Sequence, residues 1–211
     1  MELVRTANAG ILLKLDGKTI LLDGVCREVK PYPATPPQLR EQLVENCPDI
    51  VAFTHIHKDH FDPAFAAAYT GRTGRVILGP GQIKGSQTPV TLDGVTVTPV
   101  ACRHIGAAGR EVEHCGFVVQ GSQCLWFTGD SPPTAWRGKD LPKPDVLVVP
   151  YAYVNTPASW ALTQSFGAKK IVLLHMPPRD SDPAGLWSAV EASVGDMTQL
   201  QIPRMGEILH F

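Results

Sequence analysis

The feature that most constrains this chain is a run of metal-compatible side chains, His-Ile-His-Lys-Asp-His, at positions 55–60. The run follows the apolar segment 50–53, which is typical of a short buried strand. It precedes Asp62 and Pro63, which are typical of a helix N-cap and a first helical position. The run therefore lies on a strand-to-helix loop, where active sites are commonly built. Because zinc and related first-row metals prefer imidazole and carboxylate ligands, the loop predicts a metal site.

A histidine-rich loop can also be an incidental polar surface. Three of the seven histidines of this chain, however, lie in this one hexapeptide beside an aspartate, which favours metal binding. His55, His57 and Asp59 share one face if the chain stays extended, and His60 then projects elsewhere. The run can therefore serve two adjacent ions, with His55 and His57 on one and Asp59 and His60 on the other.

Three more metal-compatible residues directly follow apolar, strand-like segments: His104, Asp130 and His175. In a layered α/β protein such strand ends gather along one edge, so we expect these residues to meet the hexapeptide. His114 is the alternative to His104. We favour His104 because it follows the predicted strand 95–100 and precedes a glycine-rich loop, whereas His114 lies within a later predicted strand, where a structural role is more natural.

The pattern His-x-His-x-Asp-His resembles the signature of the metallo-β-lactamase-fold superfamily, and the segments 127–130 and 172–176 are similar to later motifs of that family. The resemblance implies an α+β fold, a four-layer αββα sandwich in which helices flank two packed mixed β-sheets. It also implies one domain over residues 1–211. The ligand sets that it implies are His55, His57 and His104 for one ion, Asp59, His60 and His175 for the other, and Asp130 as a bridge between them.

The same resemblance implies a metal-dependent hydrolase with two divalent ions, with zinc expected and manganese or iron as alternatives. Two such ions can share a hydroxide that attacks a small ester, lactone, thioester or phosphodiester. Asp59 would be the catalytic residue that orients the hydroxide or relays a proton. The chain is most similar to the short cytosolic members near the ascorbate-6-phosphate lactonase group. A non-haem iron oxidoreductase on the same scaffold and a metal-dependent nuclease are the alternative functions.

Other residues bear on the same site. Asp23 ends a predicted hairpin, and it either orients a ligand histidine or is a turn residue before Gly24. The proline-rich segment 25–37, which contains Tyr32, cannot form a regular helix or central strand, so we expect an ordered loop over the site. Three residues after a further apolar strand are either part of the pocket lining or, more simply, ordinary loop residues: Tyr151, Tyr153 and Asn155.

Turn and capping signals delimit the remaining elements. The expected helices cover residues 36–45 after Thr35, 63–69 before Gly71, 157–165, and 183–194 after Asp182. The expected strands cover residues 2–6, 10–15, 18–22, 50–53, 75–78, 90–92, 95–100, 111–120, 124–127, 145–150, 170–174, 199–202 and 207–211. This order places strands and helices in two successive halves, as a layered sandwich requires.

Composition limits the classes of partner. Nineteen basic residues against 20 acidic ones give a net charge of −1, which provides no general attraction to nucleic acid or anionic membranes. No apolar stretch is long enough to cross a bilayer, and the first residues lack the features of a signal peptide. Five cysteines without a Cys-x-x-Cys pattern favour free thiols in a reducing compartment. We therefore expect a cytoplasmic protein with a small-molecule substrate, no membrane partner and no nucleic acid; the oligomeric state stays open.

Overall fold

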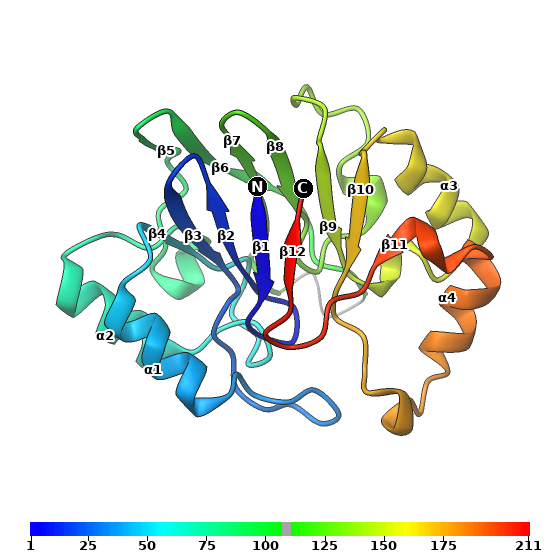
Figure 1. Ribbon diagram of the computed structural model, residues 1–211, viewed down its shortest axis with the longest axis horizontal. Helices are drawn as coiled ribbons and strands as arrows, with labels where there is room; N and C mark the ends of the chain where they lie inside the picture. Colours follow the sequence, from blue (N-terminus) through cyan, green and yellow to red (C-terminus); the bar gives the residue numbers. More distant parts are fainter. Residues whose placement is uncertain (107–110) are drawn as a thin grey trace.

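The computed structural model describes residues 1–106 and 111–211, and within them the chain forms two β-sheets with helices on their outer faces (Figure 1). The first sheet has the strand order β12-β1-β2-β3-β4, with bounds Ile208–His210, Glu2–Arg5, Ile11–Leu15, Lys18–Leu22 and Ile50–Ala52. The second has the order β11-β10-β9-β8-β7-β6-β5, with bounds Leu200–Gln201, Lys170–Leu173, Val146–Val149, Cys124–Phe127, Cys115–Gln120, Val95–Ala101 and Val90–Leu92. Both sheets contain parallel and antiparallel pairs, so both are mixed.

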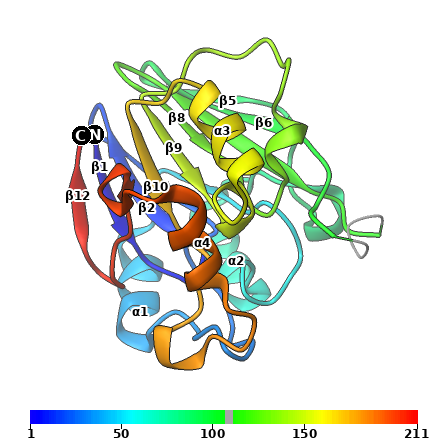
Figure 2. The same ribbon diagram turned by 90° about the vertical axis from the view of Figure 1, so that its right-hand side faces the viewer.

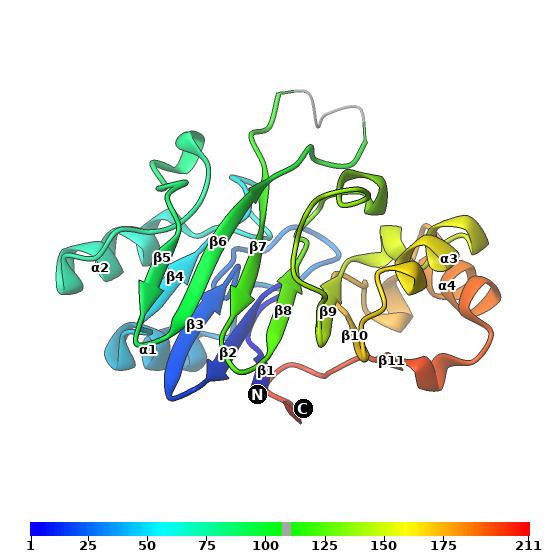
Figure 3. The same cartoon turned by 90° about the horizontal axis from the view of Figure 1, so that it is seen from above.

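The hydrophobic residues form three layers of packing. Between the sheets, alternate residues of β2 such as Leu13 face residues of the second sheet such as Phe117, in the period of two that a strand imposes. Helices α1 (Pro37–Asn46) and α2 (Pro63–Thr73) pack on the outer face of the first sheet. Helices α3 (Pro157–Ser165) and α4 (Leu186–Val194) pack on the outer face of the second. In Figure 3, α1 and α2 lie on one side of the molecule, and α3 and α4 lie on the other. The predicted four-layer αββα sandwich is confirmed.

The predicted end of α2 and the predicted cap of α1 are wrong. Helix α2 continues through Gly71 to Thr73, because Gly74, with φ of 68°, adopts the left-handed conformation and donates its N–H to the Thr70 carbonyl. Thr35 does not cap α1. Its buried hydroxyl instead accepts a hydrogen bond from the Cys26 N–H, at 3.0 Å, within the proline-rich loop.

Helix α4 also begins later than predicted, at Leu186. Asp182 is not its N-cap residue, although its carboxylate accepts hydrogen bonds from the N–H groups of Leu186 and Trp187 at 3.0 and 2.9 Å. The Asp182 carboxylate therefore satisfies the first free N–H groups of α4, although it lies three residues before the N-cap residue, Gly185.

Several predicted strands are shorter in the structure, and the two largest differences lie at residues 75–78 and 111–120. Residues 75–78 contribute two isolated bridges, from Leu78 to Ala52 and to Ser86, because Gly79, with φ of 148°, turns the chain away at once. Strand β7 begins at Cys115 rather than at Glu111. The glycine-rich loop predicted after His104 lies partly outside the described residues.

The parallel strands determine where the candidate site lies. Strand β3 pairs in parallel with β4, and β8, β9 and β10 are parallel to one another, so their carboxyl ends point to common edges of the sheets. The two chain ends, on β1 and β12, lie side by side (Figure 2). No helix in the described residues is long and apolar enough to cross a membrane.

Candidate metal centre

The structure brings the predicted ligands together at one edge of the sandwich. Three overlapping groups have donor atoms within 4.8 Å of one another: His55, His57 and His104; His55, His60 and Asp130; and Asp59, His60 and His175. The first and third groups are the two predicted sets of ligands. The second joins Asp130 to one histidine from each set, which is the position that a bridging carboxylate needs.

The hexapeptide forms a tight turn rather than an extended strand. The His60 and Phe61 N–H groups both donate to the His57 carbonyl, at 3.0 and 2.9 Å. This turn brings the His60 ring to 4.2 Å from the His55 ring, centroid to centroid. Asp62 then caps α2, as predicted, by accepting hydrogen bonds from the first two free N–H groups of the helix. Local turn chemistry therefore gathers the side chains that an extended run would separate.

Asp23 fulfils both interpretations of its role. It ends the hairpin with φ of 47°, as a turn residue, and its fully buried carboxylate holds the neighbouring loop. One oxygen accepts the Thr54 N–H at 2.7 Å, and the other accepts the Thr54 hydroxyl at 2.6 Å and lies 2.8 Å from His60 Nδ1. Asp23 thus orients a ligand histidine through a hydrogen bond, an arrangement common behind metal sites.

Thr54 orients a second ring, a role that the sequence interpretation missed. A hydroxyl has one hydrogen, and Thr54 donates it to Asp23. The contact of 2.9 Å between Thr54 Oγ1 and His55 Nδ1 therefore has the imidazole N–H as its donor. This leaves the lone pair of His55 on Nε2, the atom that lies 2.9 Å from His57 Nδ1. The only signal in the sequence was a threonine directly before the first histidine.

The rings of His60 and His104 are held in the same way. Nδ1 of His60 donates to the Asp23 carboxylate, and Nδ1 of His104 donates to the Ile105 carbonyl at 2.6 Å. Their Nε2 atoms lie 3.3 and 3.6 Å from the Asp130 carboxylate. Both rings therefore direct Nε2, the atom that a metal would bind, to the centre of the site.

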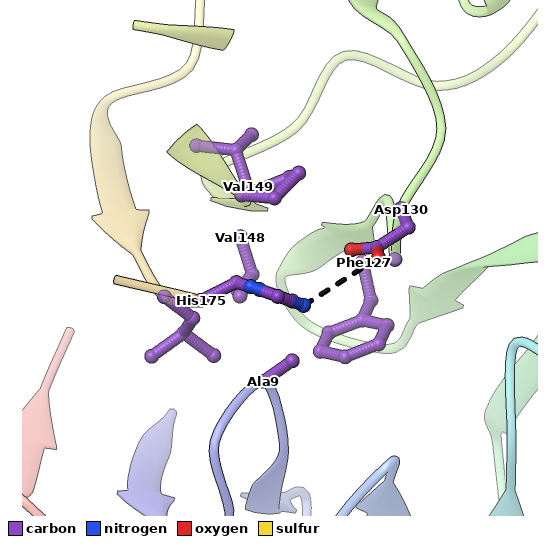
Figure 4. A pocket seen from close by; sticks show the side chains of 9 residues that line it. Ala9, Phe127, Asp130, Val148, Val149 and His175 are labelled. Carbon is purple, nitrogen blue, oxygen red and sulfur yellow. Dashed lines mark ion pairs between the residues drawn. The ribbon is translucent and has the colours of Figure 1, made fainter. Parts of the chain in front are cut away.

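His175 completes the site from the end of β10. Its Nε2 lies 3.1 Å from the Asp59 carboxylate and 3.5 Å from that of Asp130. Figure 4 shows the ring of His175 directed toward Asp130, among apolar side chains that include Phe127 and Val148. The cavity that these residues line measures about 10 Å³, so hydrocarbon closely surrounds His175 and Asp130 on this side.

Several donor atoms fit a metal because the described residues leave them without a hydrogen-bond partner. These buried atoms include Nε2 of His60, His104 and His175 and Oδ1 of Asp130. An unpaired buried polar atom costs about 1–3 kcal/mol, and a cation coordinated by these atoms would remove that cost. Imidazole and carboxylate together are the donor types that zinc, manganese and iron accept. The donor set therefore fits divalent metal ions.

The charges of the site are strongly coupled. Burial by itself lowers the pKa of His60, but the carboxylates of Asp130 and Asp23 outweigh it and raise that pKa well above the usual range. Burial and the neighbouring His60 hold the pKa of His55 well below its usual value. Burial opposes ionisation of Asp130, yet His175 and His60 keep its pKa well below the ordinary value. Asp130 is therefore a carboxylate at neutral pH.

His114 lies beside the three metal-compatible groups, with its ring 5.2 Å from that of His55, and belongs to none of them. Its Nδ1 is 3.3 Å from Cys102 Sγ, and burial lowers its pKa to about 3. A Cβ atom at Gly129 would lie 2.8 Å from His114 Nε2 and 2.6 Å from Thr54 Cγ2. Since Gly129 also has φ of 51°, only glycine fits this turn, and the turn delivers Asp130 to the site.

The aromatic residues near the site divide into two groups. Tyr151 and Tyr32 lie against His175, with ring centroids at 6.1 and 4.6 Å, so the proline-rich loop does reach the site, as predicted. Tyr153 is fully buried, and its hydroxyl lies 3.2 Å from Ser131 Oγ, so it supports the core instead. Asn155 is half-buried.

Several solved structures share the fold of this chain. An isothiocyanate hydrolase from Delia radicum gut bacteria is 20% identical, with a TM-score of 0.69 over 100% of this chain and 99% of that one. A possible metal-dependent hydrolase from Veillonella parvula is 14% identical, with a TM-score of 0.71 over 99% and 98%. CmlA, a diiron β-hydroxylase from Streptomyces venezuelae, is 12% identical, with a TM-score of 0.64 over 100% and 54%. At these identities the likeness establishes the fold.

The family follows from the sequence comparison. No curated protein matches this sequence. A protein-family model described as a beta-lactamase superfamily domain matches residues 6–165, a span that contains six of the seven candidate ligands. The resemblance inferred from the hexapeptide is confirmed: the chain belongs to the β-lactamase superfamily.

Proposed function

We propose that this chain is a metal-dependent hydrolase with two divalent ions, acting on a small ester, lactone, thioester or phosphodiester. The observation that carries the proposal is the position of Asp130. Its carboxylate lies 3.3 Å from His60, 3.6 Å from His104 and 3.5 Å from His175, so one carboxylate reaches both candidate sets. Two divalent ions bound close together would be stabilised by an anion between them, and a carboxylate has two oxygens to offer.

Each candidate ligand has a place in this proposal. His55, His57 and His104 would hold one ion, Asp59, His60 and His175 would hold the other, and Asp130 would bridge them. When bound, such ions lower the pKa of a water molecule and polarise a carbonyl or phosphoryl oxygen. The histidines contribute Nε2 or Nδ1 lone pairs, and Thr54, Asp23 and Ile105 keep the rings oriented.

Asp59 is the residue proposed for proton transfer. Burial opposes its ionisation, but the contact with His175 Nε2, at 3.1 Å, lowers its pKa below the ordinary value. Asp59 is therefore a carboxylate at neutral pH, and although the residue is buried, 13% of its side-chain surface remains exposed. A partly accessible carboxylate in this position can orient an attacking water and hold its proton.

Zinc is the proposed metal, because imidazoles dominate the donor set. Manganese and iron accept the same donors, and CmlA, which shares the fold, is named as a diiron enzyme. A small molecule is the proposed substrate. A reducing compartment, the cytoplasm, is the proposed location, since all five cysteines are free thiols in the structure.

Elemental analysis combined with substrate profiling tests the proposal. Purified protein loaded with zinc or manganese should hold about two ions per chain and should hydrolyse at least one class in a panel of esters, lactones, thioesters and phosphodiesters. His57→Ala should lose metal and activity together, while the exposed His210 provides a matched control in His210→Ala. Bound iron with oxygen consumption would favour the oxidoreductase instead, and protein that binds no metal would refute both.

A further inference from the structure

His175 differs from the other candidate ligands in how its ring is held. His55, His60 and His104 each have Nδ1 hydrogen-bonded to an oxygen of the protein. Nδ1 of His175 has no hydrogen-bond partner among the described residues, although the ring is buried, and Nε2 faces the carboxylates of Asp59 and Asp130 at 3.1 and 3.5 Å. Its backbone also has φ of 56°, a left-handed conformation that is uncommon for a residue with a side chain. No hydrogen bond at Nδ1 therefore holds the His175 ring from behind, as one does for the other three rings.

Two aromatic rings contact the His175 ring and hold its orientation. The ring of Tyr32 meets that of His175 edge to face, with centroids 4.6 Å apart and planes at 75°. Tyr151 lies on the same ring at 6.1 Å and 69°. An edge-to-face pair stabilises by more than the burial of its area, to an extent comparable with a net hydrogen bond. Such a contact is sufficient to select one ring orientation.

The loop that carries Tyr32 is fastened at several points. The backbones of Val29 and Tyr32 exchange two hydrogen bonds, at 3.1 and 2.6 Å. Cys26 and Thr35 close the base of the loop through the Thr35 hydroxyl and the Cys26 carbonyl, at 3.0 and 3.3 Å. The Arg27 N–H also donates to the Lys58 carbonyl at 2.7 Å, which links this loop to the hexapeptide. Tyr32 is therefore presented to His175 from a fixed backbone.

We propose that Tyr32 is a positioning residue for His175, whose ring it fixes so that Nε2 faces Asp59 and Asp130. The proposal rests on the proposed role of His175 as a ligand of the second ion. The aromatic ring of Tyr32 performs the function that a hydrogen bond performs for the other histidines. Its hydroxyl is not required for this role, so the proposal distinguishes the ring from the phenol.

Zinc affinity tests the proposal without any substrate. Metal-free protein is titrated with zinc against a chromophoric chelator, and the affinities for the two ions are fitted separately. Tyr32→Phe keeps the ring and should bind both ions as the unaltered protein does. Tyr32→Leu keeps bulk without an aromatic edge, and it should weaken the second ion by about 10- to 100-fold, the effect typical of losing a group that orients a ligand, while the first ion is unaffected. Val29→Ala, in the same loop and partly exposed, is the matched control.

A double-mutant cycle excludes a general loss of structure. In a His175→Ala background, Tyr32→Leu should have no further effect on zinc binding, because the ring that it positions is absent. Equal zinc affinity of Tyr32→Leu and the unaltered protein would overturn the proposal, as would an equal loss in Tyr32→Phe. If the unaltered protein binds one ion or none, the proposed function fails instead, so the two failures are distinguishable.

Discussion

Asp130 is the residue on which the two halves of the site converge. It follows β8 and Gly129, and its carboxylate faces histidines from three separate segments of the chain. Asparagine has nearly the same shape as aspartate but no charge, so the exchange isolates the electrostatic contribution. Removing a negative charge from between two dications weakens the binding of both, and the ion with three histidines is affected less.

Asp130→Asn should therefore reduce the metal content from about two ions per chain to about one and should remove most hydrolytic activity. Elemental analysis beside turnover of any active ester or phosphodiester measures both. Asp140→Asn, at an exposed position, is the control. Two retained ions with near-normal turnover would refute the bridging role.

His104 and His114 make a paired prediction, because both are buried and only one lies in a metal group. His104→Ala should lose the first ion, since it removes one of three imidazoles. His114→Ala should retain the metal content, although the turn at Gly129 loses its neighbour. The ratio of zinc to protein after dialysis decides between them, and the reverse result would exchange their roles.

Asp23→Asn tests whether a residue that contacts a candidate ligand, rather than the metal itself, affects the affinity for metal. Three donors, two from Thr54 and one from His60, point at the Asp23 carboxylate. An amide has one acceptor oxygen, and its NH₂ group would face a donor, so the His60 ring would lose its fixed tautomer. Zinc affinity should fall by about 10- to 100-fold in a chelator competition. Asp93→Asn changes an exposed turn aspartate with the same φ of 47° and should leave the affinity unchanged.

Helix α2 shows how an element delivers the site. The helix begins directly after the hexapeptide, and Asp62 satisfies its first N–H groups while also pairing with Arg40 at 3.0 Å. The cap therefore determines where the ligand turn stops and the helix starts. The ion pair between Arg40 and Asp62 is partly exposed, so it contributes little to stability. A substitution of Asp62 therefore acts mainly through the loss of the helix cap.

Asp62→Ala should lower the free energy of unfolding of the metal-free protein by about 1 kcal/mol, the usual cost of losing an N-cap. Urea denaturation followed by circular dichroism measures it. Asp140→Ala, at an exposed position outside the helices, controls for the loss of one carboxylate. An unchanged midpoint for Asp62→Ala would show that packing of α2 on the first sheet alone determines its start.

At the scale of the whole molecule, the site couples metal binding to pH. In the metal-free protein the carboxylates of Asp130 and Asp23 raise the pKa of His60, so His60 is protonated near neutral pH. The stability from this pairing is fully present below the ordinary histidine pKa, about 6.5, and is lost as pH rises through the raised value. His55 has the opposite sign, because its lowered pKa makes it lose stability as pH falls through the acid range.

Metal loading should therefore release protons, since an ion must displace the proton on His60. Calorimetric zinc titrations in two buffers of different ionisation enthalpy measure the number released, and the apparent affinity should increase with pH. Asp23→Asn removes one carboxylate next to His60, so it should release fewer protons than the unaltered protein at the same pH. Heats that do not depend on the buffer would contradict this coupling.

The sequence by itself determined the features that a few neighbouring residues control. The hexapeptide indicated the metal chemistry, Asp62 and Pro63 marked the start of α2, and the strand patterns at residues 10–15 and 18–22 marked the first hairpin. These signals are reliable because turn conformation, helix capping and strand alternation depend on interactions within about one turn of chain. The resemblance to a known superfamily added the expected partners of the hexapeptide.

Tertiary structure decided the rest. Asp130 meets His60 across 70 positions of sequence, and Tyr32 meets His175 across a longer interval, so no local pattern encodes either contact. The role of Asp23 depended on the parallel pairing of β3 with β4, which places Thr54 beside it. Packing of the two sheets brings these strand ends together, and the burial of hydrocarbon that drives this packing is not directional. The sequence therefore specifies which side chains can bind a metal, and the packed sheets specify which of them meet.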